Sequence, residues 1–167
     1  MKIFITGVAG FIAFNFAKEI LKNKNIKVIG FDNINNYYSI KLKKARIKEL
    51  KKFRNFKFIK GNLIDKKKLN QIFNSNNFNE IYNFAAQAGV RYSIEHPILY
   101  IENNVKGFIN LIDISRIKKI KKFYYASSSS VYGDSNNFPL KEKTLIHPKN
   151  IYGLSKKFNE EIAQNYF

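Results

Sequence analysis

The amino-acid sequence predicts an α/β fold in which a doubly wound parallel sheet carries helices on both of its faces. Short runs rich in β-branched and aromatic residues alternate with longer stretches of helical periodicity, and the joints between them are short. A turn with two glycines, GVAG at residues 7–10, separates the first apolar run from the first helical stretch. The chain has 167 residues, the length of one ordinary domain, so we expect residues 1–167 to form a single domain.

The first unit is a predicted strand over residues 2–6, a tight turn and a predicted helix over residues 11–23. Gly7, Gly10 and Ala13 match the G-x-x-G-x-x-G/A fingerprint of dinucleotide-binding domains. A glycine at the strand end lets the backbone turn sharply. A glycine at the helix start lets a pyrophosphate approach the backbone N–H groups and the positive end of the helix dipole. The pattern therefore predicts a Rossmann-type domain that binds a dinucleotide.

An acidic residue, Asp32, ends the second predicted strand, residues 26–32. A carboxylate at this place accepts hydrogen bonds from both hydroxyls of the adenosine ribose of NAD. It repels the 2′-phosphate that NADP carries there, so it selects NAD over NADP. The alternative is that Asp32 only caps a turn, and the glycine fingerprint upstream disfavours that interpretation. We therefore expect NAD to be the cofactor.

The remaining elements continue the alternation. The basic stretch KLKKARIKELKKFR, residues 41–54, predicts an amphipathic helix that turns Leu42, Ala45, Leu50 and Phe53 inward and a lysine-rich face to solvent. Asp65 is a natural N-cap for the helix that follows the third strand. The other expected elements are strands at 56–60, 80–84 and 122–126 and helices at 65–74, 97–116 and 152–166.

Composition excludes several classes of function. The chain has no cysteine, and its two histidines each precede a proline far apart in the sequence, so we expect no disulfide, no thiol chemistry and no metal site. The net charge of +18 has two interpretations, nucleic-acid binding or a coding bias toward lysine. Lysine is scattered along the whole chain and only four arginines occur, which favours the second, so we expect no nucleic-acid partner. No window is long and apolar enough to span a membrane.

A run of four serines, residues 127–130 in YYASSSSVYG, follows the fifth predicted strand directly. In a parallel sheet the carboxyl ends of the strands meet at one edge, where ligands bind. The GVAG turn, Asp32, AAQAG at residues 85–89 and the serines all fall on that edge. The serines are therefore predicted to belong to a site and not to a linker.

The motif YGLSK places Tyr152 and Lys156 one helical turn apart, so both side chains share a face. A phenol is a poor base at neutral pH, because its ordinary pKa is about 10. A neighbouring lysine cation favours the phenolate. A serine hydroxyl at the end of the fifth strand is able to hold the same substrate oxygen. Together with the nucleotide fingerprint and the serine-rich strand end 24 residues upstream, this combination predicts an active site in which Tyr152 is the base.

These motifs resemble the N-terminal part of the extended short-chain dehydrogenase/reductases, and most closely the UDP-glucuronate 4-epimerases. The resemblance covers essentially the whole chain, and AAQAGVRYS is its most distinctive piece. The other matching motifs are GVAGFIA, DNINNYY, ENNVKGF, ASSSSVYG and YGLSK.

The resemblance implies roles for individual residues. It implies Ser128, Tyr152 and Lys156 as the catalytic residues and Ser128, Ser129, Ser130 and Arg91 as substrate-binding residues. The implied cofactor-binding residues are Gly7, Gly10, Phe11, Ile12, Asp32, Asn33, Asn62, Leu63, Ala85, Ala86, Asn104, Tyr152 and Lys156. Three positions depart from the family pattern: Ala13 replaces a glycine, Asn15 stands where a histidine is common, and Asn62 replaces an acid beside the adenine. We expect the amide of Asn62 to weaken the pocket without abolishing it.

The implied reaction is epimerisation at C4 of a UDP-sugar through a transient 4-keto sugar, most closely UDP-glucuronate to UDP-galacturonate. UDP-glucose 4-epimerase and UDP-glucuronate decarboxylase stay open as alternatives. A dTDP-glucose 4,6-dehydratase is disfavoured, because Ser129 and Ser130 occupy the places of its acidic pair. A non-catalytic dinucleotide- or nucleic-acid-binding protein is the alternative from another class.

The family pattern continues beyond YGLSK with further strands and a smaller substrate-binding domain. We therefore expect a sheet truncated after the helix that carries this motif, in a fragment, a shortened reading frame or one piece of a split protein. Either a homodimer or a complementing C-terminal chain would then be the protein partner. The resemblance also implies a cytoplasmic location and a UDP-sugar as the small-molecule partner.

Overall fold

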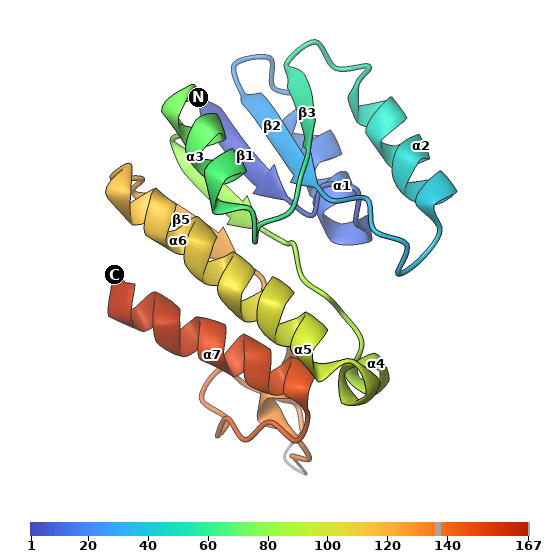
Figure 1. Ribbon diagram of the computed structural model, residues 1–167, viewed down its shortest axis with the longest axis vertical. Helices are drawn as coiled ribbons and strands as arrows, with labels where there is room; N and C mark the ends of the chain where they lie inside the picture. Colours follow the sequence, from blue (N-terminus) through green and yellow to red (C-terminus); the bar gives the residue numbers. More distant parts are fainter. Residues whose placement is uncertain (136–137, 167) are drawn as a thin grey trace.

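The computed structural model describes residues 1–135 and 138–166. Its centre is a five-stranded sheet in the order β3-β2-β1-β4-β5, with all neighbouring strands parallel (Figure 1). The strands are β1 (Lys2–Thr6), β2 (Lys27–Asp32), β3 (Phe56–Lys60), β4 (Glu80–Asn83) and β5 (Lys122–Tyr125). The helices are α1 (Phe11–Ile20), α2 (Ile40–Leu50), α3 (Lys66–Asn74), α4 (Val90–Glu95), α5 (Pro97–Tyr100), α6 (Gly107–Ile117) and α7 (Ile151–Tyr166).

The strand order creates a switch point beside β1. The chain moves outward from β1 to β2 and β3 and then returns to the other side of β1 to form β4 and β5. Thr6, the last residue of β1, pairs with Phe31 of β2 and with Asn83 of β4. The connections that leave β1 and β4 therefore diverge at one edge, where a doubly wound sheet binds its ligand. The predicted doubly wound parallel sheet is confirmed.

Two apolar layers hold the helices against the sheet. One layer joins the sheet to α3 and α6, and its buried members include Phe4, Phe73 and Leu111. The other layer joins the opposite face to α1 and α2, through residues such as Ile5 and Ala17. Alternate residues of β1 enter opposite layers, since successive side chains of a strand point to opposite faces. Helices thus cover both faces, as the alternating pattern predicts.

The α2 helix turns a different face inward from the one predicted. Leu42 and Ala45 are exposed, whereas Lys43, Ile47 and Leu50 are buried. The inward positions follow the spacing i, i+4, i+7, which rotates the helix by about one residue from the predicted face. The predicted inward set was therefore wrong for Leu42 and Ala45, and it hid a buried lysine.

Several boundaries also differ from the predicted ones. The first helix ends at Ile20 and not at Asn23, and the chain then turns through Leu21 to Asn25. The predicted helix over 97–116 consists of α5, a π-helical stretch (Ile101–Lys106) and α6. The short α4 helix and a 3₁₀ turn (Ser129–Tyr132) were not predicted. Asp65 does cap α3, since its carboxylate accepts a hydrogen bond from the backbone N–H of Lys68.

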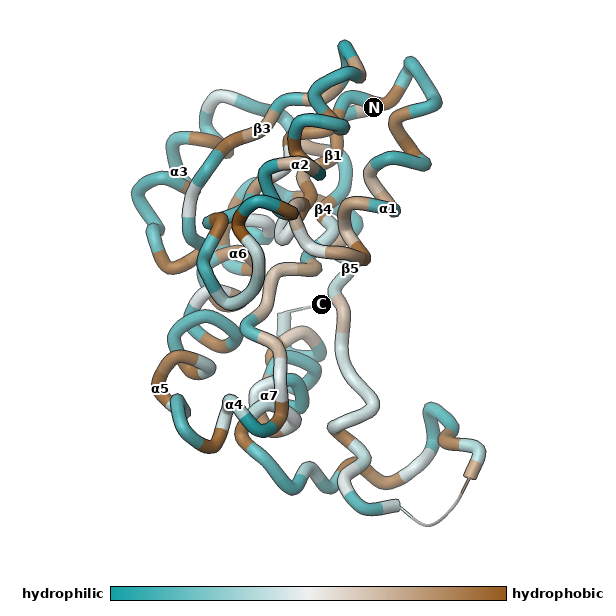
Figure 2. The backbone as a smooth tube through the Cα atoms, turned by 90° about the vertical axis from the view of Figure 1, so that its right-hand side faces the viewer, coloured by the Kyte–Doolittle hydropathy of each residue, from teal (hydrophilic) through white to brown (hydrophobic). Residues whose placement is uncertain are grey.

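The helices α4, α5 and α7 lie together at one end of the molecule, next to the long connection that follows β5 (Figure 2). Both views show this end beyond the carboxyl edge of the sheet (Figures 1 and 2). Among the described residues no helix has the length and apolar character needed to cross a membrane.

Candidate active site

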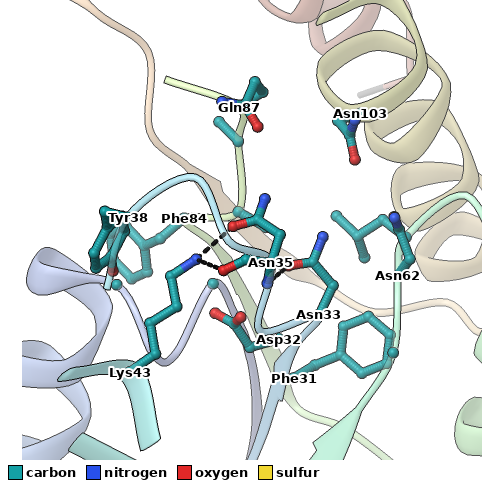
Figure 3. A pocket seen from close by; sticks show the side chains of 16 residues that line it. Phe31, Asp32, Asn33, Asn35, Tyr38, Lys43, Asn62, Phe84, Gln87 and Asn103 are labelled. Carbon is teal, nitrogen blue, oxygen red and sulfur yellow. Dashed lines mark hydrogen bonds between the residues drawn. The ribbon is translucent and has the colours of Figure 1, made fainter. Parts of the chain in front are cut away.

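A cavity opens at the carboxyl edge of the sheet, beside the switch point (Figure 3). Its lining comes from the turns after β1, β2, β3 and β4 and from the start of α2, with Asn103 on the π-helical stretch. The lining residues are Gly7, Gly10, Phe31, Asp32, Asn33, Asn35, Tyr38, Lys43, Gly61, Asn62, Leu63, Phe84, Ala85, Ala86, Gln87 and Asn103. Most of the residues predicted to bind the cofactor are in this list. Phe11, Ile12, Asn104, Tyr152 and Lys156 are not.

The glycine turn after β1 depends on the absence of side chains. Gly7 has a φ of +68°, and a Cβ added there would lie 2.8 Å from the backbone nitrogen of Ala85. Only glycine lets this turn lie against the end of β4. No side chain of the described residues caps α1, which begins at Phe11 after Gly10. The first N–H groups of α1 are thus placed to receive an anion from solution.

Asp32 is buried and uses both carboxylate oxygens within the protein. Its Oδ2 accepts a hydrogen bond from the N–H of Ala9 at 3.0 Å, and its Oδ1 accepts one from the N–H of Ile34 at 2.8 Å. The residue therefore does cap a turn, and it also lines the cavity. Each carboxylate oxygen has a second lone-pair direction. The two interpretations of Asp32 are compatible, because the capped carboxylate keeps acceptor capacity toward the cavity.

Lys43, which the sequence interpretation assigned to the solvated face of its helix, is a buried cation of this site. Its Nζ donates to the backbone oxygen of Asn35 at 2.9 Å and also to the Asn35 side-chain oxygen, and it lies 4.3 Å from the centre of the Tyr38 ring (Figure 3). Burial lowers the pKa of Lys43, although the charge of Asp32 acts in the opposite direction. The i, i+4, i+7 spacing of Lys43 with Ile47 and Leu50 is the signal that reveals it.

A second residue of α2, Arg46, supports the glycine turn and was also missed. Its Nη1 donates to the carbonyl oxygen of Ala9 at 3.1 Å and to the Tyr38 hydroxyl oxygen at 3.1 Å. The Tyr38 hydroxyl donates to the same Ala9 oxygen at 3.2 Å. Both backbone polar groups of Ala9 are therefore held: Asp32 accepts a hydrogen bond from its N–H, and Arg46 and Tyr38 donate hydrogen bonds to its carbonyl oxygen.

The loop after β4 is connected to α7 through Asn104. The N–H of Gln87 donates to Asn104 Oδ1 at 2.7 Å, and Asn104 Nδ2 donates to the Gln87 carbonyl at 3.0 Å and to Ser155 Oγ at 3.1 Å. Ser155 Oγ in turn donates to the carbonyl of Tyr152 at 2.7 Å. Asn104 is buried behind the cavity wall. Its amide thus holds the loop in place from behind.

The serine run and the YGLSK motif come together at the end of β5. Lys156 Nζ donates to the carbonyl of Ala126 at 2.9 Å, and Ser128 Oγ accepts from the N–H of Ser130 at 3.2 Å. A Cβ added to Gly153 would lie 2.5 Å from the Ser130 carbonyl oxygen, so the start of α7 lies close against the 3₁₀ turn. Burial lowers the pKa of Lys156 to about 8.

The other predicted site residues have more open positions. The half-buried ring of Tyr152 stands edge-on to the Tyr100 ring, with centroids 6.1 Å apart. Ser129 and Arg91 are exposed, and the Ser127 hydroxyl donates to the carboxylate of Glu160. Phe11 and Ile12 are exposed at the start of α1. Within residues 1–135 and 138–166 no group of three histidine, aspartate or glutamate side chains is arranged to hold a metal ion.

This fold, a doubly wound parallel sheet with a glycine turn at its switch point, is that of the nucleotide-binding domain of the extended short-chain dehydrogenase/reductases. Residues 4–167 match the family model described as GDP-mannose 4,6 dehydratase, so the chain belongs to that family. The resemblance found in the sequence motifs is thereby confirmed.

Three relatives show what the chain is similar to. It is 46% identical to Protein CapI of Staphylococcus aureus, in an alignment that covers 99% of this chain and 49% of that protein. It is 38% identical to UDP-glucuronate 4-epimerase 4 of Arabidopsis thaliana, in an alignment that covers 98% of this chain and 38% of that protein. The crystal structure of UDP-glucuronic acid 4-epimerase from Bacillus cereus, in complex with UDP-glucuronic acid and NAD, aligns with a TM-score of 0.89 and 32% identity. That alignment covers 99% of this chain and 52% of the epimerase chain. The chain therefore spans about half the length of these relatives or less.

Proposed function

We propose that this chain is the NAD-binding half of a UDP-sugar 4-epimerase that converts UDP-glucuronate to UDP-galacturonate. The observation that carries the proposal is the joint position of two features at one sheet edge. The cavity contains the glycine turn and Asp32, and the Lys156–Ala126 hydrogen bond brings the YGLSK helix to the end of the strand that precedes the serine run. The similarity to epimerases that bind NAD and UDP-glucuronic acid supports the same assignment.

The residues present fit a dinucleotide. The uncapped start of α1 offers N–H groups to a pyrophosphate, and Asp32 offers acceptor capacity to the hydroxyls of a ribose. Asn62 lines the same cavity and has an amide oxygen for the adenine amino group. The buried Asp32 carboxylate opposes an added 2′-phosphate, which supports NAD in preference to NADP. When bound, NAD would supply the nicotinamide ring that accepts the hydride and returns it.

The chain's own residues then handle the proton. Tyr152 takes the proton from the 4-hydroxyl of the sugar, and Ser128 donates a hydrogen bond to the same oxygen. Lys156 stands one turn further along α7, where its ammonium stabilises the phenolate form of Tyr152. The hydrogen bond from Lys156 to Ala126 keeps α7 in register with the strand end that carries Ser128.

Glucuronate is the proposed sugar because of the serines at residues 129 and 130. Their neutral hydroxyls are able to donate hydrogen bonds to a C5 carboxylate, which an acidic pair would repel. A 4,6-dehydratase needs an acid and a base at these positions to eliminate water, and two hydroxyls do not supply them. This chain aligns with about half of the Bacillus cereus epimerase chain, and we propose that the uridine diphosphate is held by the part of that protein outside the aligned region.

The test has two parts. First, isothermal titration of residues 1–167 with NAD should show saturable binding, and the same chain mixed with UDP-glucuronate and NAD should give no turnover. Second, a chimera that joins residues 1–167 to the C-terminal half of the Bacillus cereus epimerase should form UDP-galacturonate. Absence of NAD binding by the chain would refute the cofactor assignment. A chimera that epimerises UDP-glucose and leaves UDP-glucuronate unchanged would refute the sugar assignment.

A further inference from the structure

A groove lies at the outer end of the sheet, between α2 and the edge strand β3 (Figure 1). Its floor is apolar and is formed by Ile34, Ile47 and Phe58. Ile47 is buried, whereas Ile34 and Phe58 are half-buried and pack against the same core layer. The hollow above this floor has a volume of about 370 Å³, so it is able to receive an apolar side chain from outside.

The rim of this groove is basic. Three lysines at positions i, i+4 and i+7 form a row along one face of α2 and its C-terminal cap, and a fourth ends β3; they are Lys44, Lys48, Lys51 and Lys60. All four are exposed, and within residues 1–135 and 138–166 none of them forms an ion pair. The acidic residue of α2, Glu49, pairs with Lys52 outside the groove. An apolar floor with unpaired cations around it is complementary to a ligand that carries acidic groups around an apolar one.

The outer edge of β3 is open. Among the described residues β3 pairs with β2 alone. The N–H of Gly61, directly after β3, donates to the carbonyl of Asp32 in β2 at 3.0 Å. Because the backbone groups of successive residues in a strand point to opposite sides, Phe58 and Lys60 direct their N–H and C=O groups away from β2. These are the unpaired groups to which a further strand is able to bind.

The open edge and the groove belong to the same residues, since Phe58 and Lys60 also line the groove. A peptide strand paired with β3 would direct alternate side chains toward α2. An apolar side chain there would cover Ile47, and acidic residues two positions before and after it would lie about 13 Å apart on the same face. The row from Lys44 to Lys51 is about 10 Å long, so the two spacings are similar.

Other occupants fit this surface less well. A second copy of this chain would bring Lys57 and Lys60 of its own β3 against the same charges, and lysines on an edge strand oppose such pairing. The net charge of +18 adds to the repulsion between copies. A nucleic acid offers phosphates to the lysines, but it has no strand backbone to pair with the edge.

We propose that the open edge of β3 and the groove beside α2 bind an acidic, extended peptide segment of another protein, which adds a strand to the sheet. The groove takes one apolar side chain of that segment, and the lysine row takes the acidic side chains next to it. The groove shares no lining residue with the cofactor cavity, so this interaction is independent of the proposed function.

The test uses a fluorescein-labelled peptide, ETETITETE, whose glutamates flank the isoleucine on one face of a strand. Fluorescence anisotropy with residues 1–167 should show saturable binding. Lys48→Glu combined with Lys51→Glu should weaken this binding at least about tenfold, because each reversal replaces an attraction by a repulsion. The matched control is Lys67→Glu combined with Lys118→Glu, which changes the net charge equally at exposed positions outside the groove. It should weaken binding no more than about twofold.

Two further arms test the strand pairing. Amide hydrogen exchange followed by NMR should show slower exchange of the N–H groups of Phe58 and Lys60 in the complex than in the free chain. The same peptide with methylated backbone nitrogens should bind more weakly, because it cannot donate to the edge. The peptide EETTITTEE has the same composition but moves the glutamates away from the isoleucine on the groove face, and it should also bind more weakly.

Each contrary result overturns the proposal. Failure of the unchanged chain to bind ETETITETE would do so directly. Equal affinities for the two peptides, or equal losses in the two charge-reversed variants, would show that net charge alone governs binding. Unchanged exchange at Phe58 and Lys60 in a saturated complex would exclude strand addition. Binding of a random single-stranded DNA in place of the peptide, lost on reversal of Lys48 and Lys51, would assign the lysines to nucleic acid. Thermal melts of every variant confirm that the fold is kept.

Discussion

Lys156 of α7 and Ala126 after β5 are joined by a hydrogen bond of 2.9 Å from the lysine Nζ to the alanine carbonyl oxygen. Lys156 is 4% exposed, and the loss of water around its ammonium lowers the pKa of Lys156 from 10.5 to about 8. This contact positions the helix of Tyr152 beside the loop of Ser128. It also makes the charge on Lys156 sensitive to pH near the physiological range.

The first prediction is that the stability of the free chain depends on pH through Lys156. The folded state releases the Lys156 proton above about pH 8, whereas the unfolded state keeps it until about pH 10.5. Because the unfolded state binds more protons in this window, the free energy of unfolding should rise with pH across it, by at most about 3 kcal/mol. Urea unfolding at pH 7.5, 8.5 and 9.5 measures this slope.

The comparison with Lys156→Met isolates the effect. Other lysines and tyrosines titrate in both proteins, so their contributions cancel in the difference. The unchanged chain should gain stability relative to the variant as pH rises. Parallel curves for the two proteins would show that the buried lysine does not carry the pH dependence.

The second prediction concerns cofactor choice. Asp32→Ala removes a carboxylate that lines the cavity and that caps the N–H groups of Ala9 and Ile34. NAD affinity should fall at least about tenfold, because charged hydrogen-bond acceptors contribute more than neutral ones. NADP affinity should fall less, so the difference between the two cofactors should narrow.

A matched control exists in Asp65, which caps α3 through the N–H of Lys68 and does not line the cavity. Asp65→Ala should lower stability by about 1 kcal/mol and leave the ratio of NAD to NADP affinity unchanged. Equal affinities of the unmodified chain for the two cofactors would contradict the role of Asp32.

The third prediction concerns Lys43. Its ammonium holds Asn35 at the backbone and side-chain oxygens, next to Ile34, which has a φ of +54°. A β-branched residue is rarely found in that conformation, so the turn depends on its hydrogen bonds. Lys43→Met should therefore loosen the turn and weaken NAD binding several-fold, an effect of about 1 kcal/mol.

The neighbouring Lys44 is exposed on the same helix and offers the control. Lys44→Met should change NAD affinity less than about twofold, since surface substitutions have small effects. Similar losses in the two variants would mean that overall positive charge, and not the buried contact of Lys43, governs binding. Titration at two salt concentrations makes this distinction directly.

The fourth prediction concerns catalysis in the chimera with an epimerase C-terminal half. Tyr152→Phe removes the proposed base and should lower turnover at least about 100-fold, while NAD stays bound. Ser128→Ala removes one hydrogen bond to the reacting oxygen and should lower turnover less. Substantial epimerisation by the Tyr152→Phe chimera would disprove the proposed proton route.

Local patterns predicted much of this molecule. The turn at Gly7 is visible in the sequence because its φ of +68° is a backbone conformation that glycine adopts far more readily than any other residue. The strands are visible because their apolar runs are short and end at turn residues. The i, i+4 spacing of Tyr152 and Lys156 places them on one helical face in any fold. These properties depend on neighbours in the chain, so the sequence by itself determined them.

Tertiary structure decided the properties that depend on residues far apart in the sequence. Leu42 and Lys43 are adjacent, and helical periodicity allowed either to face inward; the packing of α2 beside the turn at Asn35 placed the lysine inside. The buried position of Gln87 follows from Asn104, 17 residues away. The contact of Lys156 with Ala126 spans 30 residues. Such contacts form only when the sheet has set its strand order, because burial and hydrogen-bond geometry are properties of the assembled layers and not of any local segment.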